Sequence, residues 1–517
     1  MPLPDIPEHF NAASAFIDRH LTDGRGDHVA LRWNGQTVTY TQLAANVNRA
    51  GNALRGLGVR PEERVLLAVF DSPEFVYAFW GALKLGAVPV PVNTFSRTDE
   101  YAYLLNDSRA SVLIASHEIW PVVAPVTTRW LRHRLVADKP AGQQSSAVSL
   151  WDVMVQAAPT LEPEPTHRDD TALWLYSSGS TGTPKGVVHL HRDLLFCAET
   201  YAREVLALGP DDVTLAAPRL FFAYGLGGGM SFALHAGATA VLVSERPTPE
   251  SMFTAIHQQR PTLFFGVPTL YAAMLQVQEA EHTYDLSSLR LCVSAGEPLP
   301  AELFNRWRER FGVEILDGIG TTEALHIFLS NRAGQVRPGS SGLPVPGYEI
   351  RLIDEEGQDV RRGDIGDLLV KGGSITAGYW HKLETTRRAL LGEWLRTGDT
   401  YYQDAEGVFW YCGRSDDMLK VSGQWVSPAE VEGLLFQHPA VLEAAMVGWE
   451  DENRLIKPKA FVVLKDGHAP SPSLAEELQA FVKARTLPHK YPRWVEFVPD
   501  LPKTATGKIQ RYKLRAS

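Results

Sequence analysis

Strand-like apolar runs alternate with helix-length amphipathic segments through most of the chain. Residues 65–70 (VLLAVF) form one such run, and an apolar-rich stretch of helix length follows it from Phe75 to Leu85. This alternation is typical of α/β folds, in which helices cover buried sheets. The pattern therefore predicts an α/β protein whose larger part is built of packed mixed sheets and helices.

The pattern changes near residue 416. Residues 413–417 (GRSDD) are rich in turn formers, and a short α+β pattern with its own helix signals follows them. We predict a large N-terminal domain of residues 1–415 and a small α+β C-terminal domain of residues 416–517. A polar, proline-punctuated stretch at residues 159–165 predicts a further connection between subdomains of the larger unit.

Two helix starts are predicted in the small domain. Ser427 is a candidate N-cap, with Pro428 at the first helical position and Glu430 closing a capping box. Ser473 and Glu476 repeat the serine-to-glutamate spacing. The apolar residues after the second start recur with a helical period, so we expect them to pack on the small domain's sheet. They are Leu474, Leu478, Phe481 and Val482.

Composition narrows the class of protein. The chain has 517 residues of which 44% are hydrophobic, enough for about three compact units at roughly 150 residues each. Counting 50 Lys and Arg against 60 Asp and Glu gives a net charge of −10, which argues against general electrostatic binding to nucleic acid or to an anionic membrane. A local basic patch stays open.

Cysteine usage and the N-terminal sequence bear on location. The three cysteines, Cys197, Cys292 and Cys412, are widely separated and odd in number, which indicates reduced thiols and not a disulfide framework. The first residues lack a basic region followed by an apolar stretch, and no run of about 18 apolar residues occurs. We therefore expect a cytoplasmic protein with no membrane partner.

The strongest local signal is the loop from Tyr176 to Val187 (YSSGSTGTPKGV), which directly follows a strand-like run. Glycines let the backbone approach a ligand closely, and the exposed N–H groups and hydroxyls can donate to phosphate oxygens. The loop is not a Walker A motif, because Gly186 follows the lysine and residues 188–190 continue as a strand. An ordinary surface loop is the alternative, although such a loop is seldom so tightly bracketed by strands.

This loop resembles the phosphate-binding signature of the acyl-adenylate-forming superfamily, which contains acyl- and aryl-CoA ligases, peptide-synthetase adenylation domains and luciferases. Segments that resemble the superfamily's other motifs occur in its order along essentially the whole chain. These segments are residues 81–87 (GALKLGA), 295–298 (AGEP), 320–323 (GTTE), 396–399 (RTGD), 413–417 (GRSDD) and 502–508 (PKTATGK). The chain is therefore identified as a member of this superfamily.

The resemblance implies two half-reactions, in which an acid and ATP first form an acyl-AMP and a thiol then displaces AMP. It implies ATP, Mg²⁺ and coenzyme A as cofactors or co-substrates. It places the Thr322 hydroxyl at the α-phosphate, the Glu323 carboxylate on Mg²⁺, and Lys508 as the catalytic lysine of the first half-reaction. Taken alone, Thr322 and Glu323 would also fit a helix N-cap.

Further nucleotide contacts are implied in the same way. Asp399 and Arg414 resemble the residues that hold the ribose, although an aspartate in a turn is common without any ligand. The remaining positions implied to bind ATP or AMP are Ser177, Ser178, Gly179, Ser180, Thr181, Gly182, Thr183, Lys185, Gly296, Glu297, Pro298, Asp317, Gly318 and Ile319.

The C-terminal domain supplies the moving part in this comparison. Asp416 occupies the hinge about which the small domain turns between the two half-reactions. The residues that resemble the lining of the CoA tunnel are Lys420, Ser422, Gly423 and Trp425. Cationic residues near Lys508 form a basic tail, which taken alone would fit a solvated face or a nucleic-acid patch, although the overall acidity argues against nucleic acid. With the resemblance, we expect cations to be concentrated where the phosphates of ATP and CoA arrive. The residues of the basic tail are Lys503, Arg511, Lys513 and Arg515.

The segment 220–229 (LFFAYGLGGG) faces the acyl pocket in this superfamily. It contains no aspartate to pair with the ammonium group of an amino acid, so the acid lacks an α-amino group. Aromatic walls beside small residues form a flat slot that suits a planar ring. Residues 222–227, 317–320, 325–331 and 417–423 together resemble benzoate-CoA ligases. The implied pocket residues are Phe222, Ala223, Tyr224, Gly225, Gly320, His326 and Ile327.

We therefore predict an AMP-forming aryl-CoA ligase that acts on benzoate or a ring-substituted benzoate. Gly228 and Gly229 replace bulkier residues expected in benzoate ligases, which leaves anthranilate (2-aminobenzoate) and hydroxybenzoate open as substrates. His326 is either a ring contact or a core histidine. The alternatives are an adenylating enzyme that loads a carrier protein and a non-catalytic nucleotide-binding relative. A homodimer is left open.

Overall fold

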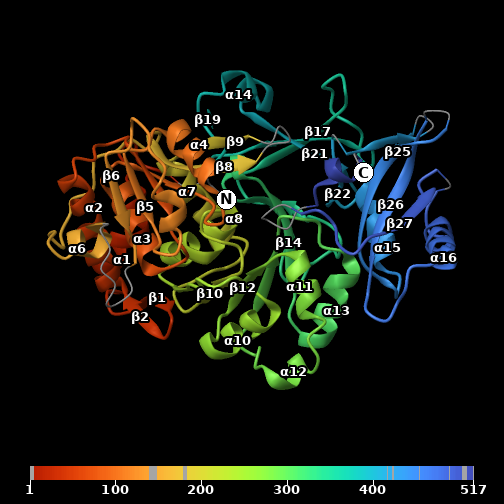
Figure 1. Cartoon of the computed structure of the whole chain (residues 1–517), viewed down its shortest axis with the longest axis horizontal. Coiled ribbons are helices and arrows are strands. Elements are labelled where there is room, and N and C mark those ends of the chain that lie inside the picture. Colours follow the sequence, from red (N-terminus) through yellow and green to blue (C-terminus); the bar gives the residue numbers. More distant parts are fainter. Residues whose placement is uncertain are drawn as a thin grey trace.

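The computed structural model describes residues 5–138, 148–178, 183–415, 417–421, 424–452, 455–487, 489–503 and 509–515. The strands of these residues form six sheets, with helices packed between and around them (Figure 1). This arrangement confirms the predicted mixed α/β fold with a large N-terminal part and a smaller C-terminal part. Within the described ranges no helix is both long enough and apolar enough to span a bilayer.

An all-parallel sheet lies near the N-terminus, in the order β4 (Val88–Pro91), β3 (Arg64–Ala68), β5 (Val112–Ala115), β6 (His133–Val136) and β7 (Val148–Ser149). The predicted strand at residues 65–70 is β3, and the predicted helix is α3 (Pro73–Lys84). Every residue of α3 is buried, so this helix lies inside the fold and is not an amphipathic surface helix.

Helix α3 contacts α2 (Tyr40–Gly56) closely, and this contact explains why the segment 81–87 begins with a glycine. A Cβ atom on Gly81 would lie 2.8 Å from both the Ala50 Cβ and the Gly51 nitrogen, so a glycine is needed for the backbones to meet. The ammonium group of Lys84 is buried and lies 2.7 Å from both Asp18 Oδ1 and Asn48 Oδ1. This segment therefore serves helix packing.

The central sheet has nine strands. Its order is β16 (Leu343–Pro344), β15 (Ile327–Ser330), β14 (Ile315–Gly320), β13 (Leu291–Ser294), β12 (Leu263–Gly266), β10 (Val213–Ala216), β11 (Thr239–Val241), β1 (Val29–Trp33) and β2 (Gln36–Thr39). The strands from β14 to β1 are parallel, and so their carboxyl ends meet at one edge. Ligands of α/β proteins bind at such an edge.

Two further sheets surround that edge. The first is antiparallel, in the order β8 (Thr171–Ser178), β9 (Pro184–Leu190) and β19 (Gly378–Tyr379), and β9 continues directly into α7 (His191–Cys197). The prediction that residues 188–190 remain in a strand is confirmed. The second sheet contains β17 (Glu349–Ile353), β18 (Gly366–Lys371), β20 (Leu390–Leu391), β21 (Trp394–Gln403) and β22 (Phe409–Arg414).

The C-terminal elements lie at one end of the molecule (blue in Figure 1). The hairpin of β23 (Leu419–Val421) and β24 (Gln424–Val426) precedes α15 (Pro428–Phe436). The sheet of β25 (Val441–Glu450), β26 (Ile456–Leu464) and β27 (Trp494–Phe497) packs with α15 and α16 (Pro472–Lys483) around one apolar cluster. The described chain ends with α17 (Arg511–Arg515).

The predicted helix starts are partly wrong. Ser427 caps α15 by accepting from the Glu430 N–H, as predicted, but the Glu430 carboxylate accepts instead from Thr486 at 2.9 Å and Lys490 at 2.6 Å. Helix α16 is capped by Ser471 and not by Ser473, because Pro472 takes the first helical position.

The predicted apolar face of α16 is largely correct. Leu478 and Val482 are fully buried against the sheet, and Leu474 packs at the margin of the same cluster. Phe481 is only partly buried and packs edge-on against His438, with ring centres 5.1 Å apart. The helical repeat of apolar residues could not predict that Phe481 lies next to His438 and outside the cluster.

Candidate active site

The base of the glycine-rich loop is held by the hairpin of β8 and β9, in which Ser177 lies opposite Lys185. The Ser177 hydroxyl donates to Glu323 Oε1 at 3.3 Å, and Lys185 Nζ lies 4.5 Å from the ring centre of Tyr379. The hairpin therefore meets the turn that follows β14. Thr183 is exposed before β9 begins. Gly179, Ser180, Thr181 and Gly182 lie outside the described residues, as does the side chain of Ser178.

The carboxylate of Glu323 is surrounded by hydroxyl donors. The Tyr379 hydroxyl donates to Oε1 at 2.9 Å, and the Thr321 hydroxyl donates to Oε2. Burial alone would raise the pKa of Glu323, but these hydrogen bonds and the charge of Lys185 hold that pKa below its ordinary value. Glu323 is therefore ionised and offers a hard oxygen ligand.

Thr322 and Glu323 form most of a single helical turn, η4 (Thr322–Ala324), between β14 and β15. Leu325 ends this turn in the left-handed region with φ +65°, which is unusual for a residue with a side chain. The turn leaves the carboxyl edge of the parallel strands, beside the segment 295–298 that follows β13. The phosphate-binding candidates and the adenine-binding candidates therefore lie at the same edge.

Asp399 and Arg414 lie directly opposite each other on β21 and β22. Arg414 Nη1 is 2.9 Å from Asp399 Oδ1 and also donates to the Thr397 carbonyl at 3.2 Å. Asp399 is buried, whereas half of the Arg414 side chain is exposed. The structure thus brings together the two residues implied to hold the ribose.

The segment implied to hold adenine is open on one side. Gly296 has φ +96°, and no atom lies within 4 Å of the place where a Cβ would stand. Asp317 lies below this segment, where its carboxyl accepts from the Leu299 N–H at 3.5 Å. Burial raises the pKa of Asp317 well above its ordinary value. Its carboxyl therefore supports the segment from inside the fold.

The neighbouring positions of β14 are shaped by strand pairing. A Cβ on Gly318 would lie 2.6 Å from the Leu329 carbonyl oxygen, and one on Gly320 would lie 2.5 Å from the His326 carbonyl oxygen. Both glycines let β15 approach closely. Ile319, between them, is partly buried.

Aromatic side chains enclose the predicted acyl pocket next to this turn. Tyr224, in α8 (Ala223–Leu226), places its hydroxyl 3.0 Å from the carbonyl oxygens of both Gly266 and Val293, at the ends of β12 and β13. The His326 ring lies 5.7 Å from the Tyr224 ring and 4.5 Å from the Phe232 ring. Burial lowers the pKa of His326 to about 3, so this imidazole is neutral.

The predicted pocket residues occupy different depths. Ala223 and Ile327 are buried, Phe222 is partly exposed, and a Cβ on Gly225 would lie 2.1 Å from the Arg219 carbonyl oxygen. A small cavity opens beside His326. Its lining consists of Leu194, Cys197, Ala223, Leu226, Gly227, Ser231, Phe232, Leu325 and His326.

Neighbouring side chains leave little room for a Cβ atom at positions 227–229. A Cβ on Gly227 would lie 2.4 Å from the His326 ring, and one on Gly228 would lie 2.5 Å from the Phe265 ring. A Cβ on Gly229 would lie 3.2 Å from Ala216 Cβ and from Leu220 Cδ2, a tight approach that a shift of a few tenths of an ångström in these side chains would relieve. The Phe265 ring therefore occupies the space that a bulkier residue at position 228 would fill.

The residues implied for the moving domain are only partly described. Lys420 pairs through its backbone with Trp425 across β23 and β24, and nothing is stated of their side chains. Asp416, Ser422, Gly423 and Lys508 lie outside the described residues.

Three cations of the basic tail form ion pairs within the C-terminal domain. Arg511 lies 2.8 Å from Glu432, Lys503 lies 2.7 Å from Glu443, and Arg515 forms an ion pair with Asp417. Acidic side chains of the same domain thus compensate these cations. Arg511 and Lys503 are partly buried and Arg515 is exposed, and a charge count could not show these ion pairs.

Several polar residues around the turn were not predicted from the sequence. Tyr379 comes from β19, and His189 and Asp193 lie behind the turn, fully buried. The available signal was a histidine and an aspartate four residues apart, which are one helical turn from each other and would need partners if buried.

Taken together, these features define an enzyme that activates an acid with a nucleotide at the carboxyl edge of a parallel sheet. Residues 18–380 match the family model described as AMP-binding enzyme, and residues 430–508 match the model of the AMP-binding enzyme C-terminal domain. The chain belongs to the AMP-binding enzyme family, which confirms the predicted membership.

Well-matched relatives are named for aromatic acids. The chain is 51% identical to the benzoate–CoA ligase of Thauera aromatica over 520 residues, covering 100% of this chain and 98% of that protein. It is 47% identical to the 4-hydroxybenzoate–CoA/benzoate–CoA ligase of Rhodopseudomonas palustris, covering 100% and 95%. The crystal structure of an anthranilate CoA ligase in complex with anthranoyl-AMP matches with a TM-score of 0.95, 45% identity and coverage of 100% and 98%.

Proposed function

We propose that this protein is an AMP-forming aryl-CoA ligase for benzoate or a ring-substituted benzoate such as anthranilate or hydroxybenzoate. The observation that carries the proposal is that one short segment joins the two halves of the site. Thr322 and Glu323 lie at the start of the turn, and His326, directly after the turn, lies among the aromatic side chains of the pocket. An aryl carboxylate in that pocket would project toward the groups assigned to the ATP phosphate. The names of the full-length relatives support the same substrate class.

In the first half-reaction the aryl carboxylate oxygen attacks the α-phosphorus of ATP and pyrophosphate leaves. Glu323 would hold Mg²⁺, which neutralises phosphate charge when bound, and its ionised state fits that role. Among the described residues no three His, Cys, Asp or Glu side chains gather into a metal site. Thr322 donates to the α-phosphate, and Lys508 stabilises the developing charge.

The other nucleotide contacts follow the predicted assignment. Asp399 and Arg414 hold the ribose, the loop from Ser177 to Lys185 holds the phosphates, and the segments 296–298 and 317–319 flank the adenine. Asp399 is suited to the ribose because Arg414 keeps its carboxylate in a fixed direction.

In the second half-reaction the CoA thiol attacks the acyl carbon, AMP leaves, and the aryl-CoA forms. We assign residues 1–415 to the adenylation domain and residues 416–517 to a mobile domain that turns at Asp416 and lines the CoA tunnel with Lys420, Ser422, Gly423 and Trp425. The cytoplasm is the proposed location, because free cysteines are usual in a reducing compartment and Cys197, Cys292 and Cys412 are all free.

Pyrophosphate release with benzoate, 2-aminobenzoate, 4-hydroxybenzoate and a short fatty acid tests the substrate class. We expect release with the aromatic acids and thioester formation with free CoA. Formation of the adenylate without any thioester, unless a carrier protein is added, would overturn the CoA assignment. Retained ATP binding with no pyrophosphate exchange in the wild type would identify a non-catalytic relative.

A further inference from the structure

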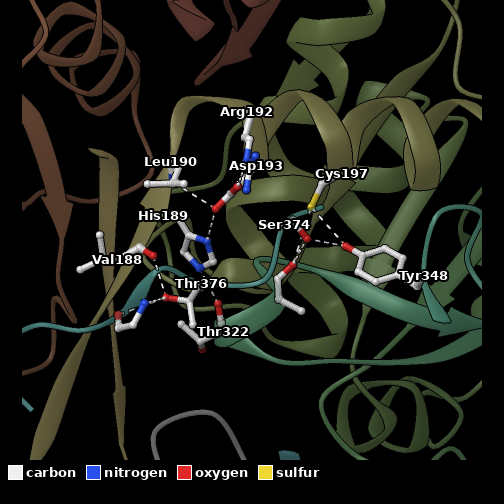
Figure 2. Close-up of polar contacts among 12 residues, drawn as sticks. Val188, His189, Leu190, Arg192, Asp193, Cys197, Thr322, Tyr348, Ser374 and Thr376 are labelled. Carbon is white, nitrogen blue, oxygen red and sulfur yellow. Dashed lines mark hydrogen bonds and ion pairs between the residues drawn. The ribbon is translucent and has the colours of Figure 1, made fainter. Parts of the chain in front are cut away.

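The turn that carries Thr322 and Glu323 is held from behind through each of its backbone carbonyls. The Thr322 carbonyl oxygen lies 2.7 Å from His189 Nε2, and the Glu323 carbonyl accepts from the Thr376 N–H at 2.8 Å. The Ala324 carbonyl accepts from the Ser374 hydroxyl at 2.7 Å. Figure 2 shows these donors arriving from two directions, with His189 at the end of β9 and Ser374 and Thr376 before β19.

His189 is oriented by an aspartate one helical turn further along the chain. Its Nδ1 lies 2.9 Å from Asp193 Oδ2, which also accepts from the Leu190 N–H at 3.0 Å at the start of α7. Because a carbonyl oxygen only accepts, Nε2 must donate to Thr322. Both side chains are fully buried, and buried polar groups are retained only where they are paired. This pair is thus arranged so that one imidazole N–H points at one carbonyl.

Ser374 has a comparable support. Its hydroxyl lies 2.5 Å from the Tyr348 hydroxyl, and both residues are buried (Figure 2). The Thr376 hydroxyl donates to the Val188 carbonyl at 2.6 Å, which ties the segment 374–376 to the strand that carries His189. The two sets of anchors therefore form one connected body.

The turn needs such support because it is strained. Leu325 follows Ala324 with φ +65°, a conformation that a residue with a side chain keeps only where its surroundings determine it. If the anchors loosened, Leu325 would relax and the Thr322 hydroxyl and Glu323 carboxylate would change direction.

We propose that His189, oriented by Asp193, and Ser374 are positioning residues for adenylation. Neither touches a substrate in this proposal. Each fixes a carbonyl of the turn, and the turn then presents the Thr322 hydroxyl and the Glu323 carboxylate to the phosphate and its cation. The inference rests on the proposed function, because the proposed function assigns the Thr322 hydroxyl and the Glu323 carboxylate to the nucleotide and its cation.

The test compares full-length His189→Ala, His189→Gln and Ser374→Ala with His191→Ala as the matched control. His191 is also buried, but its Nδ1 accepts from the Ala12 N–H at 3.1 Å and does not reach the turn. The measurements are ATP–pyrophosphate exchange with benzoate, MgATP affinity by calorimetry without the acid, and the melting temperature.

We expect His189→Ala to lower the kcat of exchange by about 10- to 100-fold, as small misplacements of catalytic groups do, and to weaken MgATP binding several-fold. The KM for benzoate should change less than about threefold, because the pocket is not altered. His189→Gln, whose amide can donate to the carbonyl, should recover part of the loss, and Ser374→Ala should lower kcat by about tenfold.

A general loss of folding would affect both histidine variants. The proposal is contradicted if His191→Ala lowers kcat and MgATP affinity as much as His189→Ala does, or if His189→Ala and Ser374→Ala leave both unchanged. If the alanine variant at position 189 does not fold, His189→Gln and Ser374→Ala decide by the same criteria. A wild type that binds MgATP but exchanges no pyrophosphate with any aryl acid would refute the proposed function, and the MgATP affinities of the variants would still test the positioning.

Discussion

Glu323 and His326 are three residues apart, and their surroundings set opposite charge states. Hydroxyl donors and Lys185 keep Glu323 ionised, whereas an aromatic enclosure keeps His326 neutral. The first environment suits a phosphate-bound cation, and the second suits an uncharged ring. The side chains that surround this one turn therefore make one half of the site polar, at Glu323, and the other half apolar, at His326.

The glycines beside the pocket can be tested individually. Gly228→Ala should destabilise the protein by about 1–3 kcal/mol and raise the KM for benzoate, because the added methyl would meet the Phe265 ring at 2.5 Å and displace it toward the pocket. Gly229→Ala is the control, since its methyl would approach Ala216 and Leu220 at 3.2 Å, which small shifts can relieve, and would not meet the Phe265 ring. Chemical denaturation and benzoate kinetics measure both effects, and equal results for the two variants would contradict the packing argument.

The neutral state of His326 predicts a pH effect on stability. Its pKa is lowered from 6.5 to about 3 in the folded protein, so between these values the unfolded chain binds a proton that the folded chain does not. The wild type should therefore lose stability relative to His326→Gln as pH falls from 7 to 5, by up to about 1.4 kcal/mol per pH unit below 6.5. Denaturation curves of both proteins at several pH values measure the difference. A difference that does not vary with pH would show that the imidazole is not kept neutral.

Some of the strands and helices could be predicted from the sequence, and others could not. The strand at β3, the presence of helix α3 and the cap at Ser427 followed from apolar runs and turn chemistry, whereas the complete burial of α3 did not. The start of α16 did not, because Ser471 with Pro472 and Ser473 with Glu476 offer competing signals two residues apart. His189 and Ser374 were also missed, since their role depends on β9 and the segment before β19 meeting the same turn.

The pairing of Asp399 with Arg414 across the antiparallel strands β21 and β22 leads to a further prediction. Asp399→Ala should reduce kcat/KM for ATP by about 10- to 100-fold, because a charged hydrogen-bond partner of the ribose is lost and Arg414 loses its orientation. Asp367→Ala in the neighbouring strand β18 is the control, since Asp367 pairs with Arg396 and Ser415. Kinetics at saturating benzoate measure both. An unchanged kcat/KM for ATP in Asp399→Ala would remove Asp399 from the nucleotide site.

At the scale of the whole molecule, the glycine-rich hairpin, the turn and the Asp399–Arg414 pair come from three different sheets. The order of motifs along the chain could predict this assembly only through the family resemblance. Composition contributed the size and the acidity, but it could not show that Lys503 and Arg511 pair with acidic side chains of the C-terminal domain.

The central claim is that the acid is activated as an aryl-adenylate and then transferred to CoA. Benzoate labelled with ¹⁸O in its carboxylate, incubated with the protein, MgATP and CoA, tests it most directly by mass spectrometry of the products. Because the carboxylate oxygen that attacks the α-phosphorus leaves with AMP, the account predicts benzoyl-CoA together with AMP that carries one ¹⁸O atom. Benzoyl-CoA formed with unlabelled AMP, or with the label in a released phosphate, would contradict it.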